Sequence, residues 1–428
     1  MTGVRGESRD PELGPTPAPD FSGPRVLVFT TLFPNPAEPL HGVFVRHRVA
    51  AVARHYPTRV VAPILDRGGP WGRNGRASAQ ERQGHLAVSH PRYTTVPLFG
   101  RCTDGLVLYL QVLAHMRRIH REFPFDVIDA HYAFPDGAAA TLLAARFRVP
   151  VAVTVRGADL DLLPRFRLRR RAIARTLRRA DRIFAVSEHL AARAVELGAA
   201  RRSIVVVANG VDPATFSYGD SEPARRILGI PTGQPLILCV GALRARKGQH
   251  VLVEALARME ARADGPPVVL IGSDPSPLRG YRRRLERLIA RRGLGSRVRL
   301  LGSVDQEALG HWYRAADLLV LPAFGEGSPN VVREALACGT PVVASHVGGV
   351  PELVTSKDVG VLVEPGDVDG LARALHEALR KRWDRRAIAA HGRARDWQTV
   401  GSEIGRELAE LTGSPSRGER EPAKAPRG

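Results

Sequence analysis

Two glutamates in the C-terminal half form the pattern with the clearest chemistry. Glu326 and Glu334 are separated by seven residues in the segment FGEGSPNVVREALACGTPVV. Carboxylates accept hydrogen bonds from sugar hydroxyls. A helix is expected over 330–337, and its first backbone N–H groups can bind an anion. The loop and the start of this helix supply four further candidate positions: Gly327, Ser328, Pro329 and Asn330. The segment therefore indicates a ligand with hydroxyl groups and a negative charge.

A lysine that follows an expected strand is the second candidate. The run PLILCVGAL ends near Gly241, and Lys247-Gly248 precedes an expected helix over 249–259. A cation beside helix N-terminal amides can hold a phosphate, and a glycine at a strand end lets the backbone approach a ligand. The segment is not a Walker A loop, because G-x4-G-K-[ST] is absent. A solvated lysine is the alternative, but the chain has 59 arginines and only four lysines, which favours a function here.

Two candidates in the N-terminal half also follow expected strands. His131 lies in DAHYAFPDG, and Arg156 lies in TVRGADLD. A histidine after a buried strand is commonly a hydrogen-bonded core or turn residue, and Arg156 could instead form a surface ion pair with Asp159. Asp159 and Asp161 form a D-x-D pair, a spacing found in some metal sites, but it also occurs by chance in a chain of this size. We therefore expect no metal there.

The elements that must position these residues alternate regularly along the chain. Short apolar, β-branched runs are each followed by a stretch with helical periodicity, from RVLVFT at 25 to SIVVVANG at 203. After a polar segment at 217–235 the pattern restarts and continues to TPVVAS at 340. Strands this apolar between helices predict parallel sheets covered on both faces. We predict an α/β fold with two doubly wound, Rossmann-like domains that face an interdomain cleft, where ligands commonly bind.

Composition sets the predicted boundaries. The chain has 428 residues, enough for two or three domains. Both ends are rich in Pro, Gly, Ser and charge, and such segments cannot bury enough apolar area to order. The predicted parts are a disordered tail over 1–22, an N-terminal domain over 23–213, a linker over 214–234, a C-terminal domain over 235–395, a last helix over 396–411 that packs back toward the N-terminal domain, and a disordered tail over 412–428.

The net charge of +20 suggests three classes of partner: nucleic acid, an anionic membrane surface or phosphorylated small molecules. The densest basic segment covers 164–184, where Phe166, Ile173, Leu177 and Phe184 recur at helical spacing among arginines. A basic amphipathic helix is typical of a membrane surface. The alternative is a helix packed on its own sheet with solvated arginines. Nucleic acid is disfavoured, because the sequence has no aromatic stacking platform or binding module.

The cysteines and the N-terminal sequence indicate the compartment. Cys102, Cys239 and Cys338 are odd in number and widely spaced, which argues against a disulfide framework or a zinc site. No apolar signal region and no run of 18 apolar residues occurs. We therefore expect a cytoplasmic protein, associated at most peripherally with the inner face of the plasma membrane.

Together, these motifs resemble those of the retaining glycosyltransferases of family four, which have the GT-B fold. The resemblance rests on Gly-x5-Lys-Gly, on the Glu-x7-Glu segment and on VGGVPELV, and it covers nearly all of the ordered chain. EPLHGVFVRHRVAAVA is similar to the family's N-terminal glycine loop and its helix. VVVANGVDPATF is similar to its interdomain signature, and DVIDAHYAFPDG to the segment that carries its active-site histidine.

The resemblance implies a role for each candidate. The catalytic residues would be His131 near the transferred sugar, Lys247 on the diphosphate and Glu326 on the donor sugar hydroxyls. The donor-binding residues would be Gly42, Arg156, Gly241, Arg246, Lys247, Gly327, Ser328, Pro329, Asn330 and Glu334, with Gly42 beside the phosphates and Glu334 on the ribose. Family members often have an arginine directly after the glycine equivalent to Gly241. This chain has Ala242 there, so either Arg244 or Arg246 compensates or Lys247 acts alone.

The implied function is the transfer of a sugar, with retention, from a UDP- or GDP-linked donor to a hydroxyl acceptor in cell-envelope, exopolysaccharide or glycolipid synthesis. No metal or other cofactor is expected, because cations and amide dipoles would stabilise the leaving diphosphate. The favoured mechanism is front-face attack, with the leaving phosphate helping to deprotonate the acceptor. The expected partners are the donor, an acceptor that could be lipid-linked and an anionic membrane, but not nucleic acid. The alternatives are a same-fold sugar-nucleotide epimerase or phosphorylase and an arginine-rich nucleic-acid-binding protein.

Overall fold

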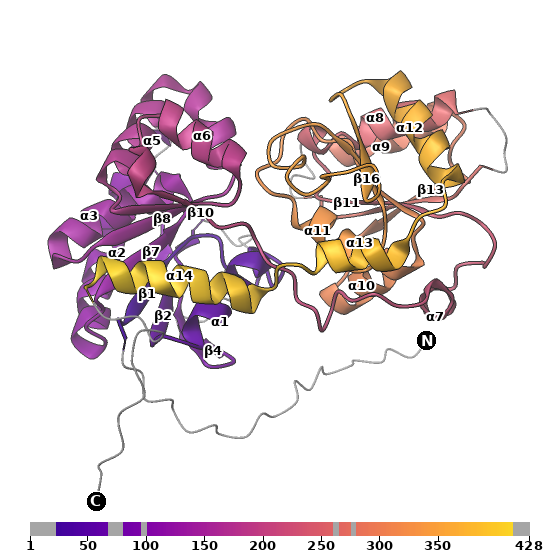
Figure 1. Cartoon of the computed structure of the whole chain (residues 1–428). Coiled ribbons are helices and arrows are strands. Elements are labelled where there is room, and N and C mark those ends of the chain that lie inside the picture. The colour runs from indigo at the N-terminus through magenta and orange to yellow at the C-terminus, as the bar shows by residue number, and fades with distance from the viewer. Residues whose placement is uncertain (1–22, 67–79, 96–100, 260–264, 275–279, 414–428) are drawn as a thin grey trace, which may run out of the picture.

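The protein folds into two lobes, each built on its own parallel sheet (Figure 1). The computed structural model describes residues 23–66, 80–95, 101–259, 265–274 and 280–413. The predicted tail over 1–22 lies outside these ranges, as does all but the first two residues of the tail predicted over 412–428. The prediction of two doubly wound α/β domains is confirmed.

The N-terminal sheet has eight strands in the order β10-β9-β8-β7-β1-β2-β5-β4. Every neighbouring pair is parallel except β4 with β5. The central strands are apolar and fully buried, as a sheet covered on both faces requires. The strands are β1 (Val26–Phe29), β2 (Thr58–Val61), β4 (Gln80–Gln83), β5 (Leu86–Ser89), β7 (Val127–His131), β8 (Val151–Val155), β9 (Arg182–Ala185) and β10 (Ile204–Val206). A separate parallel pair joins β3 (Ile64–Leu65) and β6 (Arg92–Tyr93).

Helices cover both faces of this sheet. One face carries α2 (Asp104–Glu122), α3 (Ala138–Phe147), α5 (Arg167–Arg179) and α6 (Glu188–Glu196), and the short α4 (Ala158–Asp161) follows β8. The other face carries α1 (Val43–Ala53) and α14 (Trp397–Leu411). The carboxyl ends of β1, β7 and β8 therefore point to the edge of the lobe where His131 and Arg156 lie.

The C-terminal sheet has six parallel strands in the order β13-β12-β11-β14-β15-β16. They are β11 (Ile237–Val240), β12 (Val268–Ile271), β13 (Val298–Gly302), β14 (Leu318–Leu321), β15 (Val342–Ser345) and β16 (Gly360–Val363). The helices are α7 (Ser221–Leu228), α8 (Gln249–Arg258), α9 (Tyr281–Arg291), α10 (Gln306–Ala315), α11 (Asn330–Ala337), α12 (Val368–Arg380) and α13 (Arg385–Gly392). The segment predicted as a linker contains α7, which packs on α10.

The chain crosses between the lobes twice. After β10 it passes into the C-terminal lobe, and after α13 it returns through Asp396, which pairs with Val211 of the first crossing. α14 then lies along α1, where Val400, Ile404 and Leu408 join the core beneath β1 (Figure 1). The last helix thus ties the two crossings to the N-terminal sheet.

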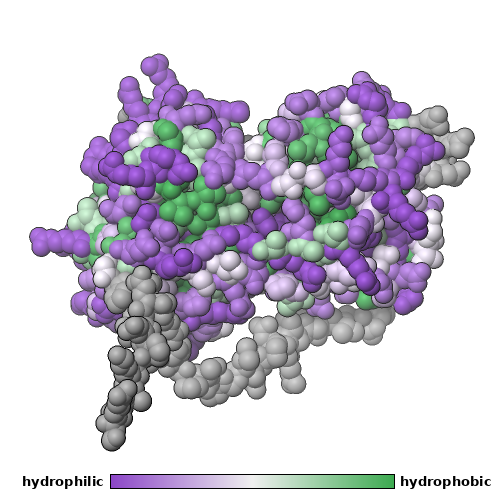
Figure 2. All heavy atoms as spheres, in the orientation of Figure 1, coloured by the Kyte–Doolittle hydropathy of each residue, from purple (hydrophilic) through white to green (hydrophobic). Residues whose placement is uncertain are grey.

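The surface is mainly hydrophilic, as Figure 2 shows for one face, although apolar residues gather in the middle of the N-terminal lobe in this view. Within the described residues, no helix combines the length and the apolar character needed to cross a membrane.

Candidate active site

Lys247 and Glu326 meet on the C-terminal lobe. Lys247 ends a short turn before α8, and Glu326 lies in the loop after β14. Lys247 Nζ lies 2.6 Å from Glu326 Oε1, and the Glu326 carboxylate is largely buried. Gly241 is adjacent, since a Cβ there would lie 3.6 Å from the side chain of Lys247. The two sequence motifs of this lobe therefore form one site.

The loop around Glu326 is held by an arginine from the same turn. Arg246 Nη1 donates to the carbonyl oxygen of Gly325, whereas Arg244 is exposed. Arg246 is thus near the predicted phosphate position, and its compensation for Ala242 stays a prediction. Ser328 and Pro329 lead into α11, where Asn330 Oδ1 accepts a hydrogen bond of 2.8 Å from Asn209 Nδ2 of the N-terminal lobe.

Glu334 lies one turn into α11. The hydroxyl of Tyr313 donates to its Oε2 over 3.0 Å. Burial raises the pKa of Glu334 to about 7, although the bond from Tyr313 opposes this shift. One side of the carboxylate is therefore engaged by protein, and the other is available for a hydroxyl donor.

Gly42 and α1 face this group from the other lobe. Gly42 precedes α1 with φ of 71°, and a Cβ there would lie 2.5 Å from the carbonyl oxygen of Leu32, so the position requires glycine. Phe44 and His47 of α1, together with Asn330 and Glu334, border a cavity of about 100 Å³ between the lobes. The predicted glycine loop and the predicted ribose-binding glutamate therefore share one cleft.

His131 and Arg156 lie together at the carboxyl ends of β7 and β8. Arg156 Nη2 is 2.8 Å from His131 Nδ1. The His131 side chain is fully buried, and its Nε2 lies 3.5 Å from Asp129 Oδ2. Burial and the charges of Arg156 and Arg48 hold the pKa of His131 well below its usual range. A contact between His131 and the transferred sugar stays a prediction.

Asp159 is not the surface partner of Arg156 that the sequence allowed as an alternative. Its carboxylate is buried and accepts the backbone N–H groups of Ala133, Arg156 and Gly157. Asp161 instead lies 3.1 Å from His189 Nε2. The described residues contain no cluster of three metal-ligating side chains. Metal independence is an expected absence and stays a prediction.

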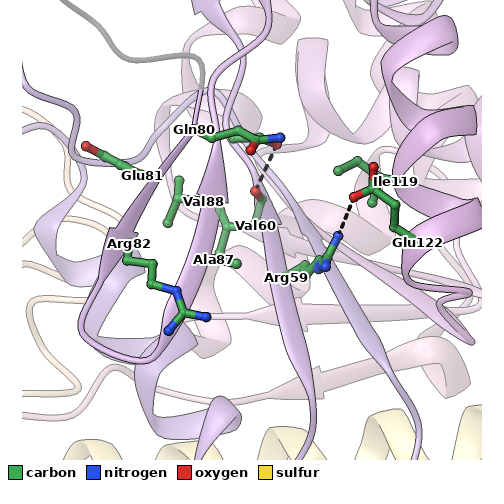
Figure 3. A pocket seen from close by; sticks show the side chains of 10 residues that line it. Arg59, Val60, Gln80, Glu81, Arg82, Ala87, Val88, Ile119 and Glu122 are labelled. Carbon is green, nitrogen blue, oxygen red and sulfur yellow. Dashed lines mark hydrogen bonds and ion pairs between the residues drawn. The ribbon is translucent and has the colours of Figure 1, made fainter.

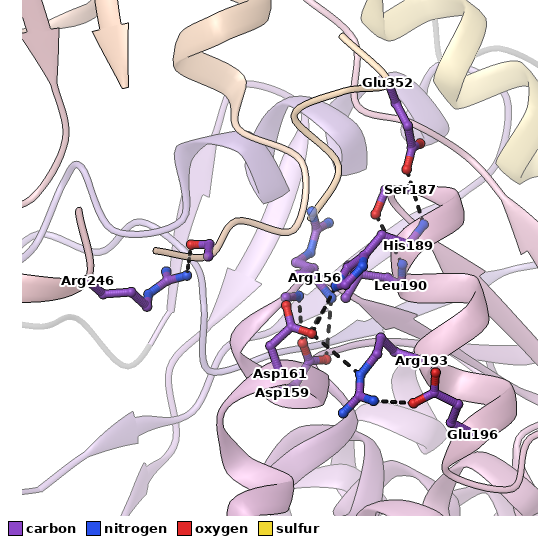
Figure 4. A network of polar contacts seen from close by, with 12 residues as sticks. Arg156, Asp159, Asp161, Ser187, His189, Leu190, Arg193, Glu196, Arg246 and Glu352 are labelled. Carbon is purple, nitrogen blue, oxygen red and sulfur yellow. Dashed lines mark hydrogen bonds and ion pairs between the residues drawn. The ribbon is translucent and has the colours of Figure 1, made fainter. Parts of the chain in front are cut away.

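The lobes touch directly beside the Lys247–Glu326 pair. A Cβ on Gly327 would lie 2.1 Å from the carbonyl oxygen of Arg156, so only glycine allows this approach. Farther along, Glu352 of the C-terminal lobe accepts the backbone N–H groups of Glu188 and His189 at the start of α6, over 3.0 and 3.1 Å (Figure 4). The loop after β14 and the carboxyl end of β8 are thus held in contact.

Two of the larger cavities among the described residues lie elsewhere. One of about 340 Å³ adjoins β2, β4 and the end of α2, where Arg59 and Glu122 point toward each other (Figure 3). The other, of about 590 Å³, lies between α8 and α9 and includes His250 and Tyr281. Neither is lined by a predicted site residue.

Sequence reasoning missed three residues that surround the His131–Arg156 pair. Arg48 and Phe44 are four residues apart on α1, and Asp129 is two residues before His131 on β7. The spacing of four on a helix and of two on a strand places each pair on one face. That periodicity could have identified Asp129, whereas the approach of Arg48 and Phe44 depends on how α1 packs on the sheet.

The basic segment over 164–184 differs from the single amphipathic helix predicted. α5 ends at Arg179, Phe184 belongs to β9, and Phe166 precedes the helix with its side chain exposed. Ile173 and Leu177 pack into the core, as the packed-helix alternative required. Arg182 is paired with Glu407 and Glu410 of α14.

Two family models match consecutive parts of the chain. The family model described as "Glycosyltransferase Family 4" matches residues 47–215, and the one described as "Glycosyl transferases group 1" matches residues 220–395. The two matches cover the two lobes. The chain belongs to the family-four glycosyltransferases. The GT-B fold expected from the resemblance is also confirmed.

Individual members of the glycosyltransferase family are similar over different lengths. The D-inositol 3-phosphate glycosyltransferase of Geodermatophilus obscurus is 36% identical over 276 residues, which are 61% of this chain and 61% of that protein. The glycosyltransferase TuaC of Bacillus subtilis, named for teichuronic acid biosynthesis, is 28% identical over 382 residues, which are 83% of this chain and 90% of that protein. The crystal structure of Anabaena Alr3699/HepE with UDP and glucose superposes with a TM-score of 0.69 at 22% identity, covering 90% of this chain and 99% of that one.

Proposed function

We propose that the protein transfers a sugar from a nucleotide-diphosphate sugar to a hydroxyl acceptor with retention of configuration. The observation that carries the proposal is the Lys247–Glu326 pair, 2.6 Å apart in the interdomain cleft. Lys247 would hold the diphosphate, Glu326 the hydroxyls of the donor sugar and Glu334 the ribose. UDP is one donor base to test, since the similar Anabaena protein binds it. GDP remains an equal candidate.

The chemistry would rest on stabilising the leaving diphosphate. Lys247, Arg246 and the amides at the start of α11 would stabilise the developing negative charge, and we propose that no metal takes part. We propose front-face attack, in which the leaving phosphate helps to deprotonate the acceptor hydroxyl. The buried Glu326 is paired with Lys247, which suits a sugar contact better than a nucleophile.

We propose that the N-terminal lobe, which would bind the acceptor, contacts the cytoplasmic face of an anionic membrane. Phe166 and Leu168 are exposed at the start of α5 beside three exposed arginines: Arg167, Arg170 and Arg171. Leu106 and Leu110 of α2 are also exposed. Exposed apolar side chains among cations suit an anionic lipid surface. A lipid-linked acceptor in envelope, exopolysaccharide or glycolipid synthesis would fit, and the TuaC relative is named for such a pathway.

The proposal is tested by nucleotide binding followed by turnover. Melting temperatures with UDP, GDP and ADP, each without magnesium and with EDTA, should rise for at least one nucleotide. Mass spectrometry with a panel of UDP- and GDP-sugars and polyprenyl-phosphate-linked saccharides should then identify product and anomer. If no nucleotide shifts the melting temperature and no nucleotide sugar is consumed, the transferase proposal is wrong. Salt-sensitive binding to duplex DNA instead would favour the nucleic-acid alternative.

A further inference from the structure

A fully buried arginine lies beneath the cleft. Arg48 of α1 is 1% exposed, and its nearest carboxylate is Asp129, with Nη2 to Oδ2 at 3.9 Å. No guanidinium nitrogen of Arg48 has a hydrogen-bond partner among the described residues. The guanidinium lies over the ring of Phe184, 5.0 Å from its centroid. A buried charge with so little compensation is costly, so a purely structural arginine is hard to explain here.

Arg48 is the first member of a buried line of charges that reaches the cleft. Asp129 Oδ2, which faces Arg48, also lies 3.5 Å from His131 Nε2. On the other side of the imidazole, His131 Nδ1 lies 2.8 Å from Arg156 Nη2. Arginine can only donate, so Nδ1 must carry the lone pair and the imidazole proton must be on Nε2, facing Asp129.

Both ends of this line are fixed by α1. Phe44 and Arg48 are one helical turn apart, and the guanidinium of Arg156 lies over the Phe44 ring, 5.0 Å from its centroid. Both nitrogens of the His131 ring therefore face protein groups. The backbone carbonyl of Arg156 lies against Gly327 in the loop after β14, and its guanidinium lies over Phe44, which borders the cavity between the lobes. Of the pair, Arg156 is therefore the residue that adjoins the other lobe.

We infer that His131 is a positioning residue that acts through Arg156. Arg48 and Asp129 are further positioning residues: the charge of Arg48 helps to keep the imidazole neutral, and Asp129 faces Nε2–H and so directs Nδ1 toward Arg156. Arg156, rather than His131, then meets the substrate. Only the test that measures activity rests on the proposed function. The protonation state of His131 can be measured without any turnover.

Burial and the charges around His131 explain the neutral state. Arg48 faces it from α1, Arg156 from the end of β8 and Asp129 from its own strand, and the charge of Asp159 on α4 is directed at backbone N–H groups. Two guanidiniums outweigh one carboxylate, so protonation of the imidazole is disfavoured. Protonated Nδ1 would also lose the hydrogen bond from Arg156. Arg48 thus maintains that bond from a distance.

The first test separates positioning from chemistry at residue 131. In His131→Asn the amide oxygen can take the place of Nδ1 and accept from Arg156, whereas His131→Leu cannot. We expect kcat/KM within about threefold of wild type for Asn and a loss of roughly 10- to 100-fold for Leu, the range for a hydrogen bond to a charged group. Equal loss in both variants at unchanged melting temperature, or no loss in Leu, would overturn the inference.

The second test reads the imidazole directly. Nitrogen-15 NMR of histidine-labelled protein, with His131 assigned from His131→Asn, should show the neutral Nε2–H form at pH 6.5, where an ordinary histidine is half protonated. Arg48→Met should raise the pKa of His131 and move the acid limb of the kcat profile with it. Arg54→Met, at the exposed end of α1, is the matched control and should change neither. If wild-type His131 carries its proton on Nδ1, the inference is overturned, whether or not Arg48→Met folds. The inference is also overturned if Arg48→Met folds and the pKa of His131 is unchanged in it.

Discussion

Lys247 Nζ and Glu326 Oε1 lie 2.6 Å apart, so the cation proposed to hold the diphosphate is paired with the carboxylate proposed to bind the sugar. The pair joins the turn before α8 to the loop after β14. Both side chains are mostly shielded from water, 20% and 7% exposed, which makes the pairing electrostatically significant. The two residues are therefore expected to respond in opposite ways to substitution.

Lys247→Met should weaken UDP binding by roughly 10- to 100-fold, the range for a lost charge-assisted hydrogen bond. It also leaves Glu326 unpaired beside the phosphate. Glu326→Gln removes the negative charge that opposes an anion, so UDP binding should be unchanged or tighter while sugar transfer is lost. Isothermal titration calorimetry and turnover measure the two effects.

Lys357→Met is the control for this comparison, since Lys357 is an exposed lysine on the same lobe. It should leave UDP affinity and turnover unchanged. Weaker UDP binding in Glu326→Gln than in Lys247→Met would contradict the proposed division of roles.

Glu334 should make stability depend on pH. Its pKa is raised by burial to about 7 in the folded protein, against an ordinary value of 4.5. The unfolded chain therefore releases this proton first, and wild-type stability falls as pH rises from 4.5 through 7. Glu334→Gln keeps an acceptor for Tyr313 but does not titrate. It should be equally stable at pH 4.5 and more stable by about 1–3 kcal/mol at pH 8.

Urea unfolding of both proteins between pH 4.5 and 8 checks this prediction. The buried Asp136, whose pKa burial also raises to about 7, is present in both and cancels from the difference. A constant difference across the range would show that Glu334 does not carry the shifted pKa. UDP binding should weaken in Glu334→Gln if the carboxylate holds the ribose.

Glu352 should control how firmly the lobes are held together. Its carboxylate accepts two N–H groups at the start of α6 across the interface. These bonds are exposed, so Glu352→Ala should cost only about 1 kcal/mol of stability. We expect a larger radius of gyration by small-angle scattering and a several-fold higher KM for the donor. Glu364→Ala, an exposed carboxylate on the same lobe, should leave both unchanged.

The sequence was sufficient for the architecture because buried parallel strands have a strong apolar signature. Strands β1, β7 and β8 lie within runs identified from their apolar, β-branched residues, and α11 begins at Asn330, where the first turns of a helix were expected. The Lys247–Glu326 contact joins residues 79 apart. The family resemblance assigned both residues to the donor, but neither it nor the local pattern predicted that they would contact each other.

The residues that surround His131 could not all be predicted from local sequence patterns. Periodicity places Asp129 on the same face as His131, but the approach of Arg48 from another element depends on how α1 packs on the sheet. The basic segment was misjudged for a related reason. Phe184 has helical spacing to Leu177, yet the chain turns at Ala180 and enters β9, where sheet pairing decides its environment.

The start of α5 is expected to bind anionic vesicles. Changing Arg167, Arg170 and Arg171 to Glu should abolish flotation with vesicles of phosphatidylglycerol and phosphatidylcholine, because each cation near the surface contributes about 1 kcal/mol. Phe166→Ser with Leu168→Ser should weaken binding at every salt concentration, since it removes apolar contact rather than charge.

α9 offers a matched control for this surface, because it is also rich in arginine while its apolar residues Leu285 and Ile289 are buried. Changing Arg283, Arg287 and Arg291 to Glu removes the same charge from the other lobe. If both triple variants lose flotation equally, net charge alone attracts the protein, and the start of α5 is not a docking surface. Loss confined to the α5 variant would place the membrane on the N-terminal lobe, the lobe expected to bind the acceptor.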